Sequence, residues 1–194
     1  MENYSFFAML SRMKYINRWG LMRNTISENI AEHSLETGMI AHALAVINNV
    51  YFNGDIVPER VAVYAMYHDV PEIITGDLPT PVKYFAPQIK EAYKVVEETA
   101  VHKLLDSLPE EMKNVYEEIL REDKIESGYR KLVKAADKIS ALIKCVEEKR
   151  MGNQEFCQAE ASTIRAIRDL QCREADYFLD NFLSAYSLTI DEQA

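Results

Sequence analysis

The sequence predicts an all-α fold, and three observations support this. Only 6 Gly and 6 Pro occur among the 194 residues. No segment alternates apolar and polar residues as a half-buried strand does, and the apolar positions recur instead at helical spacing. Apolar residues make up 48% of the chain and charged residues 27%, which is typical of a globular domain. We therefore expect one helical domain, residues 1–194, with about six or seven helices.

Residues that start and stop helices divide the chain into its expected elements. Ser27 is a predicted N-cap, Pro58 and Pro109 are placed at helix starts, and Gly152 is placed just after a helix end. The helix that contains VAVYAMYHDV is expected to end or bend at Pro71. The expected helices cover residues up to about 15, about 27–49, 58–71, 88–107, a short segment from 109, 129–150 and 155–187, with a linker at 17–20 and a loop at 76–81.

The charge balance and the cysteines limit the partners and the compartment. The formal net charge of −9 argues against a nucleic-acid polymer as partner, because phosphate backbones are bound by clusters of Lys and Arg. No apolar run reaches the ~18 residues that span a bilayer, and the N-terminus lacks the pattern of a signal peptide. The 3 cysteines show no C-x-x-C spacing and are expected to be free thiols. We therefore expect a cytoplasmic protein that does not bind membranes.

Two histidines and two aspartates are candidate metal ligands. His33, the adjacent pair His68-Asp69, and Asp137 each lie in an apolar or small-residue stretch of an expected helix. An ionised carboxylate in such a stretch is costly unless it is paired or bound to a cation. Two imidazoles and two carboxylates suit Mn, Co, Ni or Zn better than Ca or Mg. A single histidine on a helix is more often a core or capping residue than a ligand, so only the combination is informative.

Short motifs around these residues carry a family resemblance. They are N-R-W at 17–19, A-E-H-S at 31–34, H-D-V-P-E at 68–72, T-G-D-L-P-T-P-V-K at 75–83 and K-A-A-D-K at 134–138. In this order they resemble the HD-domain phosphohydrolases, and in detail they resemble the bacterial 5'-deoxynucleotidase branch over nearly the whole chain. The resemblance implies a helical HD-domain bundle that hydrolyses deoxyribonucleoside 5'-monophosphates to deoxynucleoside and phosphate. It also implies a homodimer and one divalent transition metal ion, with Co favoured among Co, Mn, Ni and Zn.

The resemblance assigns specific roles to the acidic and histidine residues. His33, His68, Asp69 and Asp137 are implied as the metal ligands, and all of them except His68 are also expected to lie against the substrate. Glu72 follows His68 by four residues and therefore shares its face on a continuing helix. We expect Glu72 to orient or deprotonate the attacking water.

The loop at 76–81 is expected to contact the substrate. Asp77 lies in a loop stiffened by two prolines, and a rigid loop can hold a catalytic group in place. We expect Asp77 to lie near the leaving 5' oxygen and to assist its departure. A turn-forming Asp after glycine is the ordinary alternative. Leu78, Pro79 and Thr80 are expected to contact the substrate from the same loop.

Arg18 and Trp19 supply binding groups of a different kind. A guanidinium can bind phosphate through two parallel hydrogen bonds, which offsets the acidic surroundings. The resemblance implies that the indole of Trp19 lies beside the sugar and leaves no room for a 2'-hydroxyl. Without the resemblance, this residue, the only Trp in the chain, would be assigned to the core.

Two other functions fit the same motifs. The first is a nucleoside triphosphohydrolase or a cyclic-nucleotide phosphodiesterase, and few basic residues near the motifs are present to bind a triphosphate. The second is a non-catalytic HD module that senses a nucleotide, which would be expected to have lost a ligand or an acidic helper. His42 lies on the helix face opposite His33, and His102 lies away from every motif, so one metal ion is expected rather than two.

Overall fold

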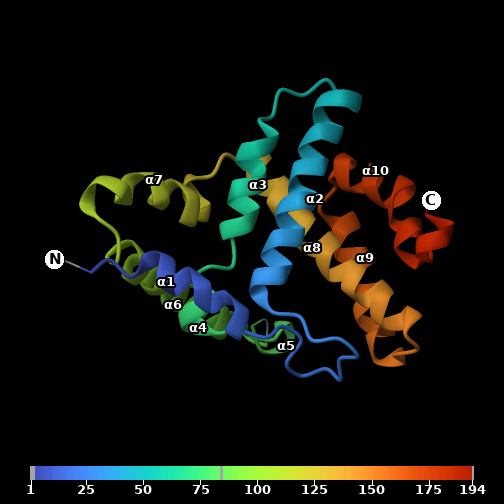
Figure 1. Ribbon diagram of the computed structural model, residues 1–194, viewed down its shortest axis with the longest axis horizontal. Helices are drawn as coiled ribbons and strands as arrows, with labels where there is room; N and C mark the ends of the chain where they lie inside the picture. The colour runs from blue at the N-terminus through green and yellow to red at the C-terminus, as the bar shows by residue number, and fades with distance from the viewer. Residues whose placement is uncertain (1–2, 84, 194) are drawn as a thin grey trace.

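Helices make up all the regular structure in the part of the chain that the computed structural model describes, residues 3–83 and 85–193. One isolated antiparallel bridge joins Asn17 to Asn29. The α-helices are α1 (Phe6–Leu10), α2 (Ile30–Tyr51), α3 (Pro58–Tyr67), α4 (Glu72–Thr75), α5 (Thr80–Lys83), α6 (Pro87–Leu105), α7 (Glu110–Leu120), α8 (Ser127–Arg150), α9 (Cys157–Asp169) and α10 (Arg173–Asn181) (Figure 1). Seven of these have nine residues or more, so the expected all-α fold is confirmed.

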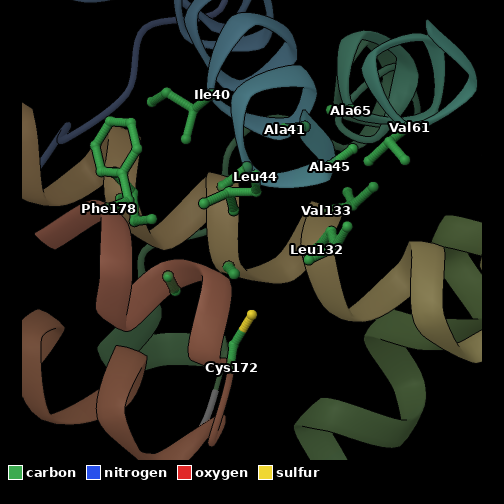
Figure 2. Close-up of a cluster of buried hydrophobic side chains, with 14 of the residues drawn as sticks. Ile40, Ala41, Leu44, Ala45, Val61, Ala65, Leu132, Val133, Cys172 and Phe178 are labelled. Carbon is green, nitrogen blue, oxygen red and sulfur yellow. The ribbon is translucent and has the colours of Figure 1, made fainter. Parts of the chain in front are cut away.

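Helices α2, α3 and α8 form the centre of the molecule. Helix α2 packs against α3, α8 and α10. Their shared core contains Ala41 and Leu44 of α2, Ala65 of α3 and Val133 of α8 (Figure 2). In Figure 1, α9 and α10 lie on one side of this centre, and α1, α4, α6 and α7 lie on the other. A second apolar cluster, which includes Phe6, forms on that other side.

Helix α2 begins two residues later than its sequence suggests. The side chain of Asn29 accepts hydrogen bonds from the backbone N–H groups of Ala31 and Glu32, and the Glu32 carboxylate accepts one from the backbone of Asn29. This reciprocal pair is a capping box, which fixes the first turn of the helix. The expected N-cap at Ser27 is therefore wrong, and Glu28 lies before the helix, where its side chain is available to other partners.

The regular helix ends just before the motif H-D-V-P-E at 68–72. Helix α3 begins at Pro58, as expected, and ends at Tyr67. His68 and Asp69 therefore lie in the turn between α3 and α4, and the expectation that they lie within a helix is wrong. Pro71 is the N-cap of α4, whose first residue is Glu72. The expected break near Pro71 is present, and it begins earlier than the proline itself.

The last expected helix, 155–187, is divided into α9, α10 and a short 3-10 helix, Leu183–Ser187. Helix α9 ends at Asp169, and Gln171 adopts a left-handed conformation with φ of 49°. A left-handed residue cannot continue a right-handed helix, so α10 starts in a new direction at Arg173. Gly152 follows the end of α8 with φ of 87°, which is the expected use of glycine at that position.

Candidate active site

Four side chains from α2, from α8 and from the turn after α3 meet at one point. The Nε2 atom of His33 lies 3.5 Å from Oδ2 of Asp69 and 3.2 Å from Oδ1 of Asp137. The Nε2 atom of His68 lies 3.1 Å from Oδ1 of Asp69 and 3.8 Å from Oδ1 of Asp137. The two imidazole centroids are 5.3 Å apart. The structure thus brings together all four residues that the sequence indicates as candidate ligands.

The electrostatics of this cluster favour positive charge at its centre. Burial, the largest single effect, lowers the pKa of His68, but the carboxylates of Asp69 and Asp137 together raise it well above its usual range. Burial likewise opposes ionisation of Asp137, but hydrogen bonds from His33 and His68 hold the pKa of that carboxyl well below its usual range. Two half-buried carboxylates that stay ionised are a suitable place for a cation.

The donor atoms fit a divalent transition ion. Ligand atoms of His33, His68 and Asp69 lie within 4.8 Å of one another. The Nδ1 atom of His68 donates to the carbonyl oxygen of Ala65 at 2.6 Å. Because Nδ1 must carry a proton to make this bond, Nε2, which lies 3.1 Å from Oδ1 of Asp69, is the ring atom that can ligate a cation. With Asp137, these residues form a set of imidazole and carboxylate donors that can hold Mn, Co, Ni or Zn.

Two further carboxyl groups lie close to the cluster and have raised pKa values. Burial, followed by the charges of Asp69 and Asp77, raises the pKa of Glu72 to about 9. One of its oxygens, Oε2, is buried without a hydrogen-bond partner in the described part of the chain. Burial also raises the pKa of Asp77, and the nearby Arg18 guanidinium opposes this. Carboxyl groups with raised pKa values can hold and exchange a proton near neutral pH, which suits acid–base chemistry.

The loop between α4 and α5 carries the remaining expected contacts. Leu78 and Pro79 are half-buried in this loop. The hydroxyl of Tyr93, from α6, donates to the carbonyl oxygen of Gly76 at 3.2 Å and so fixes the start of the loop. Thr80 begins α5, and its side chain lies outside the described part of the structure.

Arg18 and Trp19 are held beside the cluster by Glu28. The Nη1 atom of Arg18 lies 3.0 Å from Oε2 of Glu28 and 2.8 Å from Nδ1 of His33. The indole Nε1 of Trp19 donates to the same Glu28 oxygen at 2.8 Å. The backbone N–H of Arg18 also donates to the carbonyl oxygen of Glu28 at 2.9 Å. Sequence reasoning missed Glu28, because it placed this residue in the first turn of α2.

Trp19 has an unusual backbone conformation for a large side chain. Its φ is 60°, in the left-handed region that bulky residues rarely adopt. Its ring lies 5.3 Å from the ring of Phe156, and its indole N–H is held by Glu28. Strain of this kind persists only where surrounding contacts impose it, and it is concentrated at functional sites. The indole is therefore held in a defined position next to Arg18.

Comparison with known sequences gives the same assignment as the motifs. The family model described as "5'-deoxynucleotidase YfbR-like" matches residues 5–186. A 5'-deoxynucleotidase of Erwinia tasmaniensis is 48% identical over 192 residues, which cover 99% of this chain and 97% of that protein. The 5'-deoxynucleotidase YfbR of Escherichia coli is 46% identical over 192 residues, which cover 99% and 96%.

Solved structures share the fold. An HD-domain phosphohydrolase from Listeria innocua has a TM-score of 0.84 and 24% identity over 96% of this chain and 90% of that chain. The HD phosphohydrolase DatZ of cyanophage S-2L, whose structure holds dA and one catalytic Zn²⁺ ion, has a TM-score of 0.67 and 19% identity over 95% and 97%. The fold is therefore the HD-domain helical bundle. From the extent of the sequence match, the chain belongs to the YfbR-like 5'-deoxynucleotidase family.

Proposed function

We propose that this protein is a metal-dependent 5'-deoxynucleotidase, which hydrolyses deoxyribonucleoside 5'-monophosphates to deoxynucleoside and phosphate. The observation that carries the proposal is the convergence of two histidines and two aspartates beside Arg18, in a chain that belongs to this family. A phosphate has three features that this arrangement can bind: negative charge, oxygen atoms that ligate metals, and a geometry that matches a guanidinium.

In this proposal His33, His68, Asp69 and Asp137 hold one divalent cation. The mixed imidazole and carboxylate donors support a transition ion, and we propose Co²⁺ before Mn²⁺, Ni²⁺ or Zn²⁺. When bound, the cation supplies Lewis-acid activation of the phosphate and of the attacking water. The described residues contain no second group of three or more His, Cys, Asp or Glu ligand atoms as close together as these, which supports one cation rather than two.

Arg18 and Trp19 bind the two ends of the 5'-phosphosugar. Arg18 turns from His33 toward the phosphate and remains anchored through Glu28, which lies 3.0 Å from it. Trp19 lies beside the sugar, and its indole is fixed by Glu28 and Phe156, so it cannot move away from a 2'-hydroxyl. Because the indole is fixed, a ribose is disfavoured by steric exclusion.

Glu72 and Asp77 move the protons of the reaction. Glu72 accepts a proton from the attacking water through its buried carboxylate as the new P–O bond forms. With a cation held by the neighbouring ligands, the pKa of Glu72 would fall below its value of about 9, and its carboxylate would then serve as the base. Asp77, whose pKa is raised by burial, donates its proton to the 5' oxygen as the P–O5' bond breaks. Further substrate contacts are proposed for His33, Asp69, Asp137, Leu78, Pro79 and Thr80.

Phosphate release from a panel of nucleotides tests the function. Chelator-treated protein is reloaded separately with Co²⁺, Mn²⁺, Ni²⁺ and Zn²⁺ and offered each deoxy- and ribonucleoside 5'-monophosphate, dATP and a cyclic nucleotide. We expect metal-dependent release of phosphate from the deoxynucleoside monophosphates, with weaker release from their ribose counterparts. Release of pyrophosphate or triphosphate from dATP, with no reaction of dAMP, would replace the proposal with a triphosphohydrolase. Binding of dAMP without turnover would indicate a sensing module.

We also propose that the chain forms a homodimer through the outer face of α2. Leu35, Met39, Val46 and Val50 are 53%, 63%, 38% and 62% exposed, and their spacing of four, seven and four residues places them on one stripe. Because each chain carries a net charge of −9, association requires an apolar contact of this kind to outweigh charge repulsion. Met39→Glu is expected to shift the mass in analytical ultracentrifugation from dimer to monomer, whereas Val95→Glu, at a similarly exposed position on α6, is not.

The remaining expectations concern domain organisation and compartment. We propose a single domain over residues 1–194, which the family match over 5–186 supports. We propose a cytoplasmic location, which is supported by three cysteines that are all unpaired thiols in the described structure. No helix in the described residues is both long and apolar enough to cross a membrane.

A further inference from the structure

We propose that Ser140 and Glu36 are positioning residues that hold the imidazole of His33 in its cation-binding orientation. The inference rests on the proposed cation site. The Oγ atom of Ser140 lies 3.1 Å from Nδ1 of His33, on the side of the ring that faces away from Asp137. The hydroxyl of Ser140 donates a short hydrogen bond to Oε2 of Glu36. His33 and Ser140 are both fully buried, so water does not compete for these bonds.

Helix geometry explains why these residues meet. Glu36 follows His33 by three residues on α2, and Ser140 follows Asp137 by three residues on α8, so each pair shares one helix face. The two helices pack against each other. The packing that brings His33 to Asp137 therefore also brings Ser140 between His33 and Glu36.

The direction of the hydrogen bonds follows from the chemistry of the three groups. A carboxylate can only accept, so the single hydroxyl proton of Ser140 goes to Glu36. The oxygen lone pairs of Ser140 are then available to accept the N–H of Nδ1 of His33. This arrangement leaves the lone pair on Nε2, the atom that faces Asp69 and Asp137. The carbonyl oxygen of Ala65 has the same role for His68.

Arg18 also contacts Nδ1 of His33, but it cannot replace Ser140 as the hydrogen-bond acceptor for that atom. Its Nη1 lies 2.8 Å from Nδ1 of His33, but a guanidinium only donates, so this contact requires Nδ1 to be without a proton. That places the proton on Nε2, where it blocks cation binding. Thr37 lies 3.5 Å from both ring nitrogens, which is long for a hydrogen bond. Ser140, backed by Glu36, is therefore the acceptor that favours the ligating form of His33 and releases Arg18 for phosphate.

The affinity for Co²⁺ and the visible spectrum of bound Co²⁺ test the inference without measuring turnover. Ser140→Ala and Glu36→Ala are expected to weaken Co²⁺ binding by ~10- to 100-fold, the range for losing a partner of a metal-ligating histidine, and to alter the Co²⁺ absorption bands. Glu36→Gln keeps an acceptor oxygen for Ser140, so it is expected to retain most of the affinity. Glu147→Ala is the matched control, because Glu147 and Glu36 line the same cavity of about 210 Å³ but only Glu36 bonds Ser140.

The outcomes separate this inference from the proposed function. Wild-type affinity and an unchanged spectrum in Ser140→Ala and Glu36→Ala would overturn the positioning role, while hydrolysis of dAMP by the same preparations would leave the proposed function intact. An equal loss of affinity in Glu147→Ala would also overturn it, because the effect would then be one of general charge. If the wild-type protein binds no Co²⁺, both the inference and the proposed cation site fail.

Discussion

Replacing Glu148 with glutamine tests how the loop before α2 is held against α8. The carboxylate of Glu148 is fully buried. It accepts hydrogen bonds from the backbone N–H groups of Thr25 at 2.9 Å and Ile26 at 3.1 Å. It also accepts bonds from the side chains of Lys144 and Asn153. Because this one carboxylate satisfies two backbone donors of the loop, we expect it to be a main determinant of the loop's position.

The expected loss of folding stability follows from the pKa of Glu148. Burial alone would raise it, but the hydrogen bonds from Lys144, Asn153 and the loop backbone outweigh burial and lower the pKa from 4.5 to about 2. Lowering this pKa from 4.5 to about 2 corresponds to about 3 kcal/mol of folding stability at pH 7. Since the folded-state pKa is lowered, this stabilisation is present above pH 4.5 and is lost as the pH falls toward 2. By the same relation about 2 kcal/mol remains at pH 3.5.

Urea unfolding of the metal-free protein measures this effect. Glu148→Gln removes the ionised acceptor and leaves the buried charge of Lys144 unpaired. It is therefore expected to lower the free energy of unfolding by about 3 kcal/mol at pH 7. The gap from the wild type should narrow to about 2 kcal/mol at pH 3.5. Glu147→Gln, at the exposed neighbouring position, should change stability by less than about 0.5 kcal/mol. A gap below about 1 kcal/mol at pH 7, or one that is independent of pH, would refute the reasoning.

Three further substitutions test the site itself. Asp137→Asn is expected to remove both bound cation and activity, and retention of one cation per chain in metal analysis would contradict its assignment as a ligand. Glu72→Ala is expected to lower kcat by ~10² while cation and substrate binding persist, as for loss of a positioned general base. Loss of the bound cation in this variant would instead place Glu72 among the ligands. Trp19→Ala is expected to narrow the difference in kcat/KM between deoxyribo- and ribonucleotides, and an unchanged ratio would exclude Trp19 from selectivity.

The fold class was predictable because it depends on regular spacing, whereas the helix boundaries depend on local competition. Apolar positions three and four apart, together with few Gly and Pro, indicate helices whatever their tertiary contacts. Ser27 and Asn29 are both good N-cap residues, and the sequence pattern does not rank them. Asn29 is the N-cap because Glu32 completes a capping box, and because Asn29 itself is in extended geometry and bridged to Asn17.

The candidate ligand cluster was predictable from residue type and order, whereas its supporting residues were not. His33, His68 and Asp137 are chemically distinctive, so they are identifiable before their positions are known. Glu28 is one of many glutamates, and its role depends on the loop closing so that it meets Arg18. That contact joins residues ten positions apart outside any helix, where no periodicity relates them.

Helix α8 shows what such a supporting pattern looks like when it does lie on a helix. Asp137, Ser140, Lys144 and Glu148 are spaced by three, four and four residues, so they form one polar stripe along a helix that also contributes residues to the main core. Each of the last three is at least 94% buried, and a buried polar group is costly unless it is paired. Ser140 is paired with His33 and Glu36, and the other two are paired with the loop before α2. The stripe thus runs from the candidate cation site to the loop that carries Arg18. We therefore expect a substitution at any of these four positions to alter both the candidate cation site and the loop before α2.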